Sequence, residues 1–541
     1  MPMPLRGMIS GLCAAVALHA GAAAAITISY AGTYATGDPG ASAEISAYDA
    51  ATRRLFLTNS LDRTLEVIDL TNPAAPVKIN TIPLGGDPTH VSVKNGVVAV
   101  GVVAAVTTNP GTVQLYNAAD WGSGAPVTPA IATLTVGALP DMVTFTPDGT
   151  RILVANEGEP TLAVNPEGSV SIIDISGGAG SASVIATAGF SAYNGQEAAL
   201  RAAGVRIIPD PAGPAGVTVA QDLEPEYISV SPDGTKAFVT IQEANAVAVL
   251  DLATNTIAEI QPLGLKNHNL AGNGIDPSDR DNGSGGPAIN IRNVPVLGMY
   301  QPDGVASYEV AGHTYYVTAN EGDSRTFEEI RVGAAGYVLD PTAFPNAAAL
   351  KNNANLGRLQ LTNATGDTDG DGDKDEIHAF GARSFSIWDA AGNQVYDSGD
   401  DFEQITASLA PAIFNSDGTV ASFDTRSDNK GPEPEGVTVA TIFGRTYAFV
   451  GLERVGGFMV YDVTDPSMAT YVEFVRGPLT DLAPEGMLFI AASDSPTGNA
   501  LLVVSNEVSG TASIYSIVPE PGTALLLASG LAGLLGARRR A

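Results

Sequence analysis

The sequence predicts an all-β protein, a seven-bladed β-propeller with long loop insertions on one face, and two recurring patterns carry this prediction. The first is a proline and an acid that open a run of alternating apolar residues, as at Pro140-Asp141 and Pro434-Glu435. The second is an apolar run that ends in a carboxamide or an acid, as at Asn156. A recurring unit that cannot bury its own apolar face indicates stacked or radial repetition.

The two patterns form a hairpin in each unit, because tight-turn signals such as Asp148-Gly149 lie between them; only the second unit, around residues 98–103, lacks the carboxamide or acid of the second pattern. A third apolar run follows in every unit and a fourth in most of them. Four strands in each of seven units describe the propeller. The seventh unit has only three strands before the chain changes character at Val518. We therefore expect residues 26–30 to supply its fourth strand and to close a single domain over residues 26–517.

The composition favours cations as partners. The chain has 541 residues, of which 45% are hydrophobic and 16% charged, so a large core is possible. Its formal net charge of −31 argues against nucleic acid or anionic membrane as a partner. The one cysteine, Cys13, lies in an N-terminal segment that we expect to be removed, so the mature chain would hold no disulfide.

The two ends carry targeting signals. Arg6, an apolar stretch and small residues up to Ala25 predict a secretory signal peptide over residues 1–25. At the other end, residues 518–541 contain a short motif, an apolar run and a basic cluster, in this order. The motif is Pro519, Glu520 and Pro521, and the cluster is Arg538, Arg539 and Arg540. The apolar run is shorter than the roughly 20 residues of a membrane-spanning helix, and the arginines would stay on the cytoplasmic side.

This C-terminal segment resembles the PEP-CTERM sorting signal of Gram-negative bacteria in all three of its parts. The resemblance implies that the segment enters the inner membrane only transiently and that an exosortase-type enzyme cleaves it. The exported protein would then be released or attached at the cell surface. A permanent tail anchor is the alternative.

The acids of the opening pattern are expected to surround one mouth of the central channel. In an antiparallel pair the start of one strand lies beside the end of the next, so these acids would lie near the carboxamides of the second pattern. The expected ring is Glu44, Asp141, Glu226, Asp303, Glu435 and Glu485, with Thr89 in the remaining position. The expected neighbours are Asn59, Asn156, Gln242, Asn320, Glu453 and Asn506. The alternative is that these side chains only cap loops by accepting backbone hydrogen bonds.

Long insertions emerge on the same face. They cover residues 189–222, 264–297, 322–382 and 402–431. Because long loops on a rigid scaffold usually hold the binding groups, we interpret this face as the functional one.

An acidic loop within the third insertion predicts a calcium site. Carboxylates recur at alternate positions and Gly372 stands at the sixth, as in the first half of an EF-hand loop. The bidentate glutamate of the twelfth position is replaced by His378. The candidate ligands are Asp367, Asp369, Asp371, Asp373, Asp375 and Glu376. We expect a Ca²⁺ ion here to order the insertion; a solvated acidic turn is the alternative.

The catalytic candidates are Glu321, Asp323, Arg325 and Arg454, which combine acids with guanidinium groups at the same mouth. Such groups can hold a metal ion and a phosphate, as a metal-dependent phosphoesterase requires. No H-E-x-x-H or G-x-S-x-G motif occurs in the sequence. A structural Asp–Arg pair is the simpler interpretation.

Several long segments together resemble the choice-of-anchor I family, which is similar to an echinoderm mesenchyme-specific cell-surface glycoprotein and to YVTN-type propellers. These segments are residues 138–149, 155–160, 222–227, 318–325, 366–376 and 431–436. The resemblance implies an exported propeller with one of several surface-anchoring signals. Some members bear an alkaline phosphatase label, so the resemblance implies no single reaction.

Two functions follow from these observations. The leading hypothesis is a non-catalytic surface or matrix protein whose acidic face binds calcium and a partner, either an exopolysaccharide or another surface protein. The alternative is a metal-dependent phosphoesterase, alkaline phosphatase-like or phytase-like, that acts at the same face.

Overall fold

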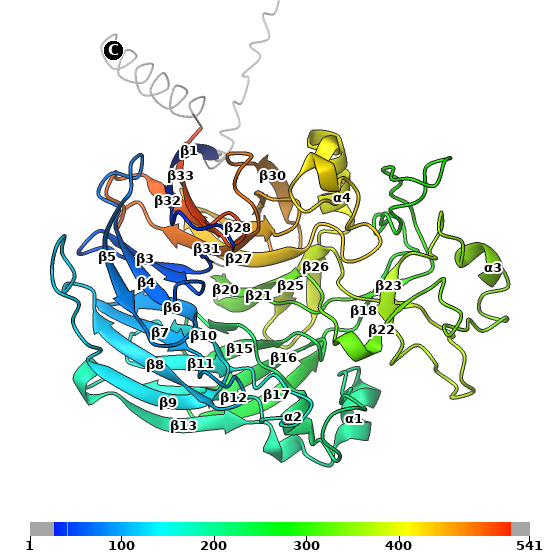
Figure 1. Ribbon diagram of the computed structural model, residues 1–541, viewed down its shortest axis with the longest axis horizontal. Helices are drawn as coiled ribbons and strands as arrows, with labels where there is room; N and C mark the ends of the chain where they lie inside the picture. The colour runs from blue at the N-terminus through cyan, green and yellow to red at the C-terminus, as the bar shows by residue number, and fades with distance from the viewer. Residues whose placement is uncertain (1–25, 41, 521–541) are drawn as a thin grey trace, which may run out of the picture.

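The computed structural model describes residues 26–40 and 42–520. Within them, seven four-stranded antiparallel sheets lie around a common centre (Figure 1). The first four, in chain order, are β2 (Ser46–Asp49), β3 (Arg54–Asn59), β4 (Thr64–Asp69) and β5 (Val77–Pro83); β6 (Pro88–Lys94), β7 (Val97–Val102), β8 (Pro110–Asn117) and β9 (Ala132–Ala138); β10 (Pro140–Phe145), β11 (Arg151–Asn156), β12 (Ser169–Asp174) and β13 (Ser183–Gly189); β14 (Ile228–Val230), β15 (Lys236–Ile241), β16 (Ala246–Asp251) and β17 (Thr256–Pro262).

The other three sheets complete the circle. They are β20 (Val305–Val310), β21 (His313–Asn320), β25 (Ser384–Asp389) and β26 (Gln394–Asp397); β27 (Pro434–Ile442), β28 (Arg445–Leu452), β29 (Phe458–Asp462) and β30 (Thr470–Val475); β31 (Pro484–Ile490), β32 (Ala500–Asn506), β33 (Thr511–Pro519) and β1 (Ile26–Ala35). The innermost strands β2, β6, β10, β14, β20, β27 and β31 each contact the next, and β31 contacts β2. This arrangement confirms the β-propeller fold class.

Among the described residues, the first strand, β1, pairs with the last, β33, as the sequence predicts. Ile28 lies opposite Ile517 and Tyr34 opposite Ala512 in an antiparallel register. The strand is longer than the predicted residues 26–30, because it continues past a bulge between Tyr30 and Gly32. Its first residue, Ile26, pairs with a residue of the sorting motif.

The position of a strand in its sheet determines its residue pattern. The second strand β11 is buried along almost its whole length, because neighbouring sheets cover both of its faces. The outermost strands β5, β13 and β17 carry many exposed residues. Between the first and second strands, the predicted tight turns are present: the Asp148 carboxylate accepts the amide N–H of Thr150 at 3.0 Å, and Gly149 has a φ of 71°. Glycine adopts this left-handed conformation at no steric cost, because it has no Cβ atom.

Two of the insertions build a further sheet outside the ring. It has five strands, in the order β18 (Leu265–Asn267), β19 (Leu297–Met299), β24 (His378–Ala379), β23 (Gln360–Thr362) and β22 (Glu329–Arg331). Strands β19 and β24 are parallel. A separate hydrophobic cluster that includes Val296, Tyr337 and Leu359 packs here, so these long loops form a structured unit.

The helices are short and lie mostly in the insertions. The α-helices are α1 (Glu197–Ala203), α2 (Val219–Asp222), α3 (Ala347–Leu350) and α4 (Asp401–Leu409). The 3₁₀ helices are η1 (Ala179–Ser181), η2 (Ser191–Tyr193), η3 (Thr326–Glu328), η4 (Pro411–Ile413) and η5 (Val420–Ser422). In the described part of the chain, no helix combines the length and the apolar character needed to cross a membrane. The predicted signal peptide and the sorting segment after Glu520 lie outside the described residues.

Candidate functional site

Each opening motif positions its acid through a kink at the start of an innermost strand. Pro140 pairs with Asn156, but the register shifts directly afterwards, so Asp141 is left out of the ladder. The same shift follows Pro434 and Pro484. A β-bulge of this kind bends the strand and redirects the side chain of the extra residue. The recurring Pro–acid pair therefore aims its carboxylates away from the sheet ladder.

These acids meet at a narrow cavity of about 50 Å³ in the centre of the ring. Residues at or just before the start of each of the seven innermost strands line it. From the predicted ring, it contains Thr89, Asp141, Asp303 and Glu485. His90 also lines the cavity, and its Nε2 atom lies 3.5 Å from the hydroxyl of Tyr227. Desolvation lowers the pKa of His90 to about 3, so its imidazole is a neutral group among acids.

The carboxyl groups at this mouth hold their protons unusually strongly. Desolvation raises the pKa of Asp141 to about 7. For Glu44, desolvation and the negative charges of Glu507 and Asp141 raise the pKa to about 8. Desolvation, followed by the charges of Glu321 and Asp141, raises the pKa of Asp303 well above its ordinary range. A bound cation would favour the ionised form of all these groups.

Glu435 of the predicted ring also lies among carboxylates. Desolvation, then Glu453 and Glu485, raises the pKa of Glu435 well above its ordinary range. One carboxylate oxygen of Glu435, Oε2, is buried and has no hydrogen-bond partner within the described structure. Oxygen atoms of Asp303, Glu321 and Glu435 lie within 4.8 Å of one another. These three side chains could hold a metal ion.

For Glu226, desolvation raises the pKa well above its ordinary range, and Glu157 and Glu243 raise it further. Glu243 is 7% exposed, and its Oε2 atom is buried without a hydrogen-bond partner in the described residues. Desolvation also raises its pKa. The group of clustered acids therefore extends from the predicted ring to the ends of the second strands.

The carboxamides of the second pattern have a different role. Asn156 is fully buried, and its amide donates to the hydroxyl of Ser171 at 3.0 Å. Asn320 is also fully buried and donates to Ser386 at 2.8 Å. Because their hydrogen-bonding groups are used inside the sheets, these residues stabilise strand ends. The capping interpretation therefore applies to these two carboxamides.

Basic groups neutralise one side of the mouth. The Lys430 ammonium lies 2.6 Å from Glu321 and 3.2 Å from Glu433. The Arg454 guanidinium lies 3.3 Å from Glu433 and 2.9 Å from Glu453. We did not predict the roles of Lys430 and Glu433 from the sequence. The position of Glu433 directly before an opening Pro–acid pair was the available signal.

Arg325 has little capacity left for a ligand. Its guanidinium lies 3.1 Å from Asp222 and 2.9 Å from Glu224. It also donates to the carbonyl oxygens of Ile208 and Asp222. The neighbouring Asp323 is partly buried, and desolvation followed by the charge of Glu243 raises its pKa to about 6. Arg325 therefore fits the simpler of the two interpretations, a structural Asp–Arg pair.

The Asp-rich loop brings its first three aspartates together. Oxygen atoms of Asp367, Asp369 and Asp371 lie within 4.8 Å of one another. The carboxylate of Asp367 accepts the amide N–H groups of Gly370 at 2.7 Å and Gly372 at 3.1 Å, which folds the loop around this side chain. The loop therefore offers clustered hard oxygen atoms of the kind that Ca²⁺ prefers.

The remaining candidates of this loop point elsewhere. Asp373 and Asp375 form a second cluster with Asp340, again within 4.8 Å. Glu376 lies 2.9 Å from Nε2 of His378. Of the six predicted ligands, three share the first cluster, two belong to the second, and Glu376 is engaged with histidine.

Comparison with known proteins identifies the fold family and the C-terminal motif. The model of the choice-of-anchor I domain matches residues 44–466, which is most of the chain. The PEP-CTERM protein-sorting motif matches residues 518–540. The sorting motif indicates export to the cell surface and implies processing by exosortase-type machinery.

Two curated animal proteins are similar in sequence. Gigasin-3a of Magallana gigas is 31% identical over 191 residues, which cover 31% of this chain and 67% of that protein. A mesenchyme-specific cell surface glycoprotein of Strongylocentrotus purpuratus is 27% identical over 348 residues, which cover 57% of this chain. The chain spans only 42% of the length of the latter.

Two solved structures are similar at low sequence identity. Hydrazine synthase of Kuenenia stuttgartiensis gives a TM-score of 0.45 at 11% identity and covers 90% of this chain and 99% of its own. The WD40 domain of Toxoplasma gondii coronin gives a TM-score of 0.42 at 9% identity, and the match covers 92% of this chain and 89% of the coronin chain. From the match over residues 44–466, the chain belongs to the choice-of-anchor I family, and it ends in a PEP-CTERM sorting motif.

Proposed function

We propose that this surface protein binds calcium at its acid-lined face and, in a calcium-dependent way, an external partner that is an exopolysaccharide or another surface protein. The supporting observation is the convergence of carboxylates from different sheets, above all Asp303, Glu321 and Glu435 with their oxygen atoms within 4.8 Å. Two ionised carboxylates about 5 Å apart repel by about 3 kcal/mol at an effective dielectric constant of about 20. A divalent cation converts this repulsion into attraction.

The unpartnered oxygen of Glu435 supports a cation at the mouth. A buried carboxylate oxygen without a donor loses its hydration and gains nothing in return. Glu321 is already bound by Lys430 and by the amide of Gln242, at 2.6 and 2.9 Å. An ion would therefore be held most strongly by Asp303 and Glu435, with Glu321 as a shared ligand.

The Asp-rich loop supports a second calcium site. Its cluster of Asp367, Asp369 and Asp371 is partly exposed, so an ion there could keep part of its hydration shell, as Ca²⁺ does in many loops. Such an ion could also coordinate oxygen atoms of an anionic glycan. The two sites together give the face a means of binding an anionic partner despite the net charge of −31.

The contacts of the arginines favour binding over phosphoester hydrolysis. A guanidinium or ammonium that is free to meet the substrate would help a phosphoesterase at this mouth to bind its phosphate. Arg325 makes four hydrogen bonds to protein oxygen atoms. Arg454 and Lys430 are both paired with Glu433. These groups would have to break existing ion pairs before they could bind a phosphate.

Calcium titration by calorimetry tests the proposal. Wild-type protein should bind calcium at both sites. Asp303→Asn combined with Glu435→Gln should remove the site at the mouth, and Asp369→Asn combined with Asp371→Asn should remove the loop site. Asp148→Asn alters a carboxylate in a tight turn and serves as the control that keeps both sites. Absence of calcium binding, or binding that all variants retain, would refute the assignment.

A second assay tests the partner. Immobilised alginate, an anionic polysaccharide, should retain the wild-type protein in calcium and release it in chelator. The mouth double variant should bind less than the Asp148→Asn control. Retention that is equal in calcium and in chelator would contradict a calcium-dependent partner.

A further inference from the structure

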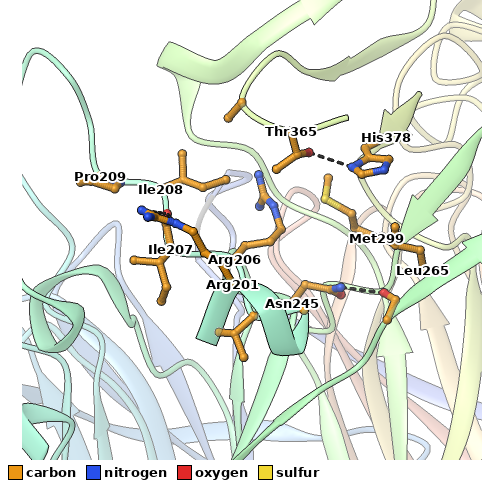
Figure 2. A pocket seen from close by; sticks show the side chains of 14 residues that line it. Arg201, Arg206, Ile207, Ile208, Pro209, Asn245, Leu265, Met299, Thr365 and His378 are labelled. Atoms are coloured by element: carbon orange, nitrogen blue, oxygen red, sulfur yellow. Dashed lines mark hydrogen bonds between the residues drawn. The ribbon is translucent and has the colours of Figure 1, made fainter. Parts of the chain in front are cut away.

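A large cavity lies where the propeller ring meets the inserted sheet, and none of the acids at the channel mouth lines it. Its volume is about 670 Å³. One wall is the segment that follows α1, with Ile208 and Pro209, and the opposite wall carries Leu265, Met299 and His378 (Figure 2). This volume lies in the range of sites that hold small organic ligands, about 300 to 1,000 Å³.

Most of the wall is apolar. Val205 and Met299 are buried, whereas Leu265 is 39% exposed and lies toward solvent. The polar groups at one edge are already engaged, because Nδ1 of His378 lies 2.8 Å from the hydroxyl of Thr365. Asn245 at the base donates to the carbonyl oxygen of Gly264 at 2.8 Å. The cavity therefore has an apolar body with few polar atoms left for a ligand.

The charged side chains that line the cavity are basic. The described residues that line it include Arg201 and Arg206 but no aspartate or glutamate, although the chain carries a net charge of −31. Arg206 is only 8% exposed. Its two terminal nitrogens bind the carbonyl oxygen of Glu243 and the carboxylate of Glu328, both at 2.5 Å.

The third nitrogen of this guanidinium is unsatisfied. Nε of Arg206 is buried and has no hydrogen-bond partner in the described structure. A buried N–H donor without an acceptor destabilises the folded protein, because it has lost its hydration. An acceptor from a bound molecule would remove this cost, and an anionic acceptor would bind more strongly than a neutral one.

We propose that this cavity binds a small amphipathic organic anion, with its anionic group at Arg206 and its apolar body between Ile208 and Met299. A medium-chain carboxylate is the simplest molecule of this class. The site is separate from the calcium-dependent binding proposed above, because none of the candidate calcium ligands lines the cavity.

The test compares three eight-carbon probes that differ only in their head group: octanoate, octan-1-ol and octylammonium. Calorimetry with the full processed chain in chelator should show saturable binding of one octanoate. Octan-1-ol should bind at least about tenfold more weakly, because its neutral hydroxyl lacks the negative charge that strengthens a hydrogen bond to the guanidinium. Octylammonium should not bind measurably.

Variants separate the apolar body from the head-group site. Leu265→Trp should fill the cavity and weaken octanoate binding at least about tenfold, whereas Leu270→Trp, at an exposed position outside the cavity, should leave it unchanged. Arg206→Gln combined with Glu328→Gln removes the ion pair without leaving an unpaired charge and should abolish the preference for octanoate over octan-1-ol.

Three results would overturn the proposal: no saturable octanoate binding, equal affinity for the acid and the alcohol, or octanoate affinity that Leu265→Trp leaves unchanged. Since the assay contains chelator, failure of the calcium proposal does not affect its outcome.

Discussion

The ring of four-stranded sheets and the inserted five-stranded sheet reach stable β-structure by different routes. In the ring, strands of mostly four to ten residues repeat one pattern, and their registers extend along whole strands. In the inserted sheet, no strand exceeds three residues, and the strands come from two separate segments of the chain. The inserted sheet depends instead on side chains such as Tyr337 and Leu359 in its own hydrophobic cluster.

This difference determines how each region presents its functional groups. The ring holds its acids on bulges at the ends of long ladders, so their positions follow from the whole fold. The inserted unit holds the Asp-rich loop and one wall of the 670 Å³ cavity on short elements. We therefore expect damage in the ring to spread and damage in the insertion to stay local.

Removal of the closing strand should have the largest effect. A chain that lacks residues 26–35 loses every pairing partner of β33 on one side and exposes an unpaired edge. We expect aggregation instead of cooperative unfolding, measured by size-exclusion chromatography and circular dichroism. A chain that begins at Ile26 is the control. A monomer that melts like this control would show that the ring does not need its N-terminal strand.

Matched core substitutions should distinguish the two regions. Leu153 in the ring and Leu359 in the inserted unit are both fully buried, so each change to alanine should cost about 2–5 kcal/mol. Leu153→Ala should lower the melting temperature of the whole domain. Leu359→Ala should increase hydrogen exchange mainly in residues 264–299 and 329–379. If both variants showed the same global destabilisation, the inserted unit would be part of one cooperative core.

A smaller effect should follow from pH in the presence of chelator. The pKa of Asp141 is raised to about 7 and that of Glu44 to about 8, against about 4 for such groups in an unfolded chain. The folded state then binds more protons than the unfolded state. The stabilising contribution of these two groups is therefore greatest below about pH 4 and is lost as the pH rises from there through about 7 to 8.

Thermal unfolding at a series of pH values measures this effect. Asp141→Asn should reduce the loss of stability between about pH 5 and 8, whereas Glu309→Gln, at an exposed residue outside the mouth, should not. A melting temperature that rises with pH over this interval would contradict the predicted direction.

The sequence predicted the regular part of the fold well, because each unit repeats the same openings and turns. The pairing of β1 with β33 could also be predicted, because the seventh unit has only three strands of its own. The inserted sheet could not be predicted, because β24 has two residues and no periodicity. The residues that line the 670 Å³ cavity are distant in the sequence, and only the fold brings them together.

The site was predicted in part. The Pro–acid pairs indicated the acids at the mouth, since their spacing recurs in each unit. The partners of Arg325 could not be predicted, because Asp222 and Glu224 lie about a hundred residues earlier in the chain. The role of Lys430 depends in the same way on how the insertion of residues 402–431 folds back toward the mouth.

Hydrogen exchange in calcium and in chelator tests the central claim most directly. The account predicts that calcium increases protection in residues 301–305, 319–325 and 433–437 at the mouth and in residues 366–376 of the Asp-rich loop. Protection of the middle strands, such as β11 and β28, should stay the same, because their hydrogen bonds do not depend on an ion. The mouth double variant should lose the effect at the mouth and retain it in the loop. Exchange that is identical in calcium and in chelator throughout these segments would contradict the account.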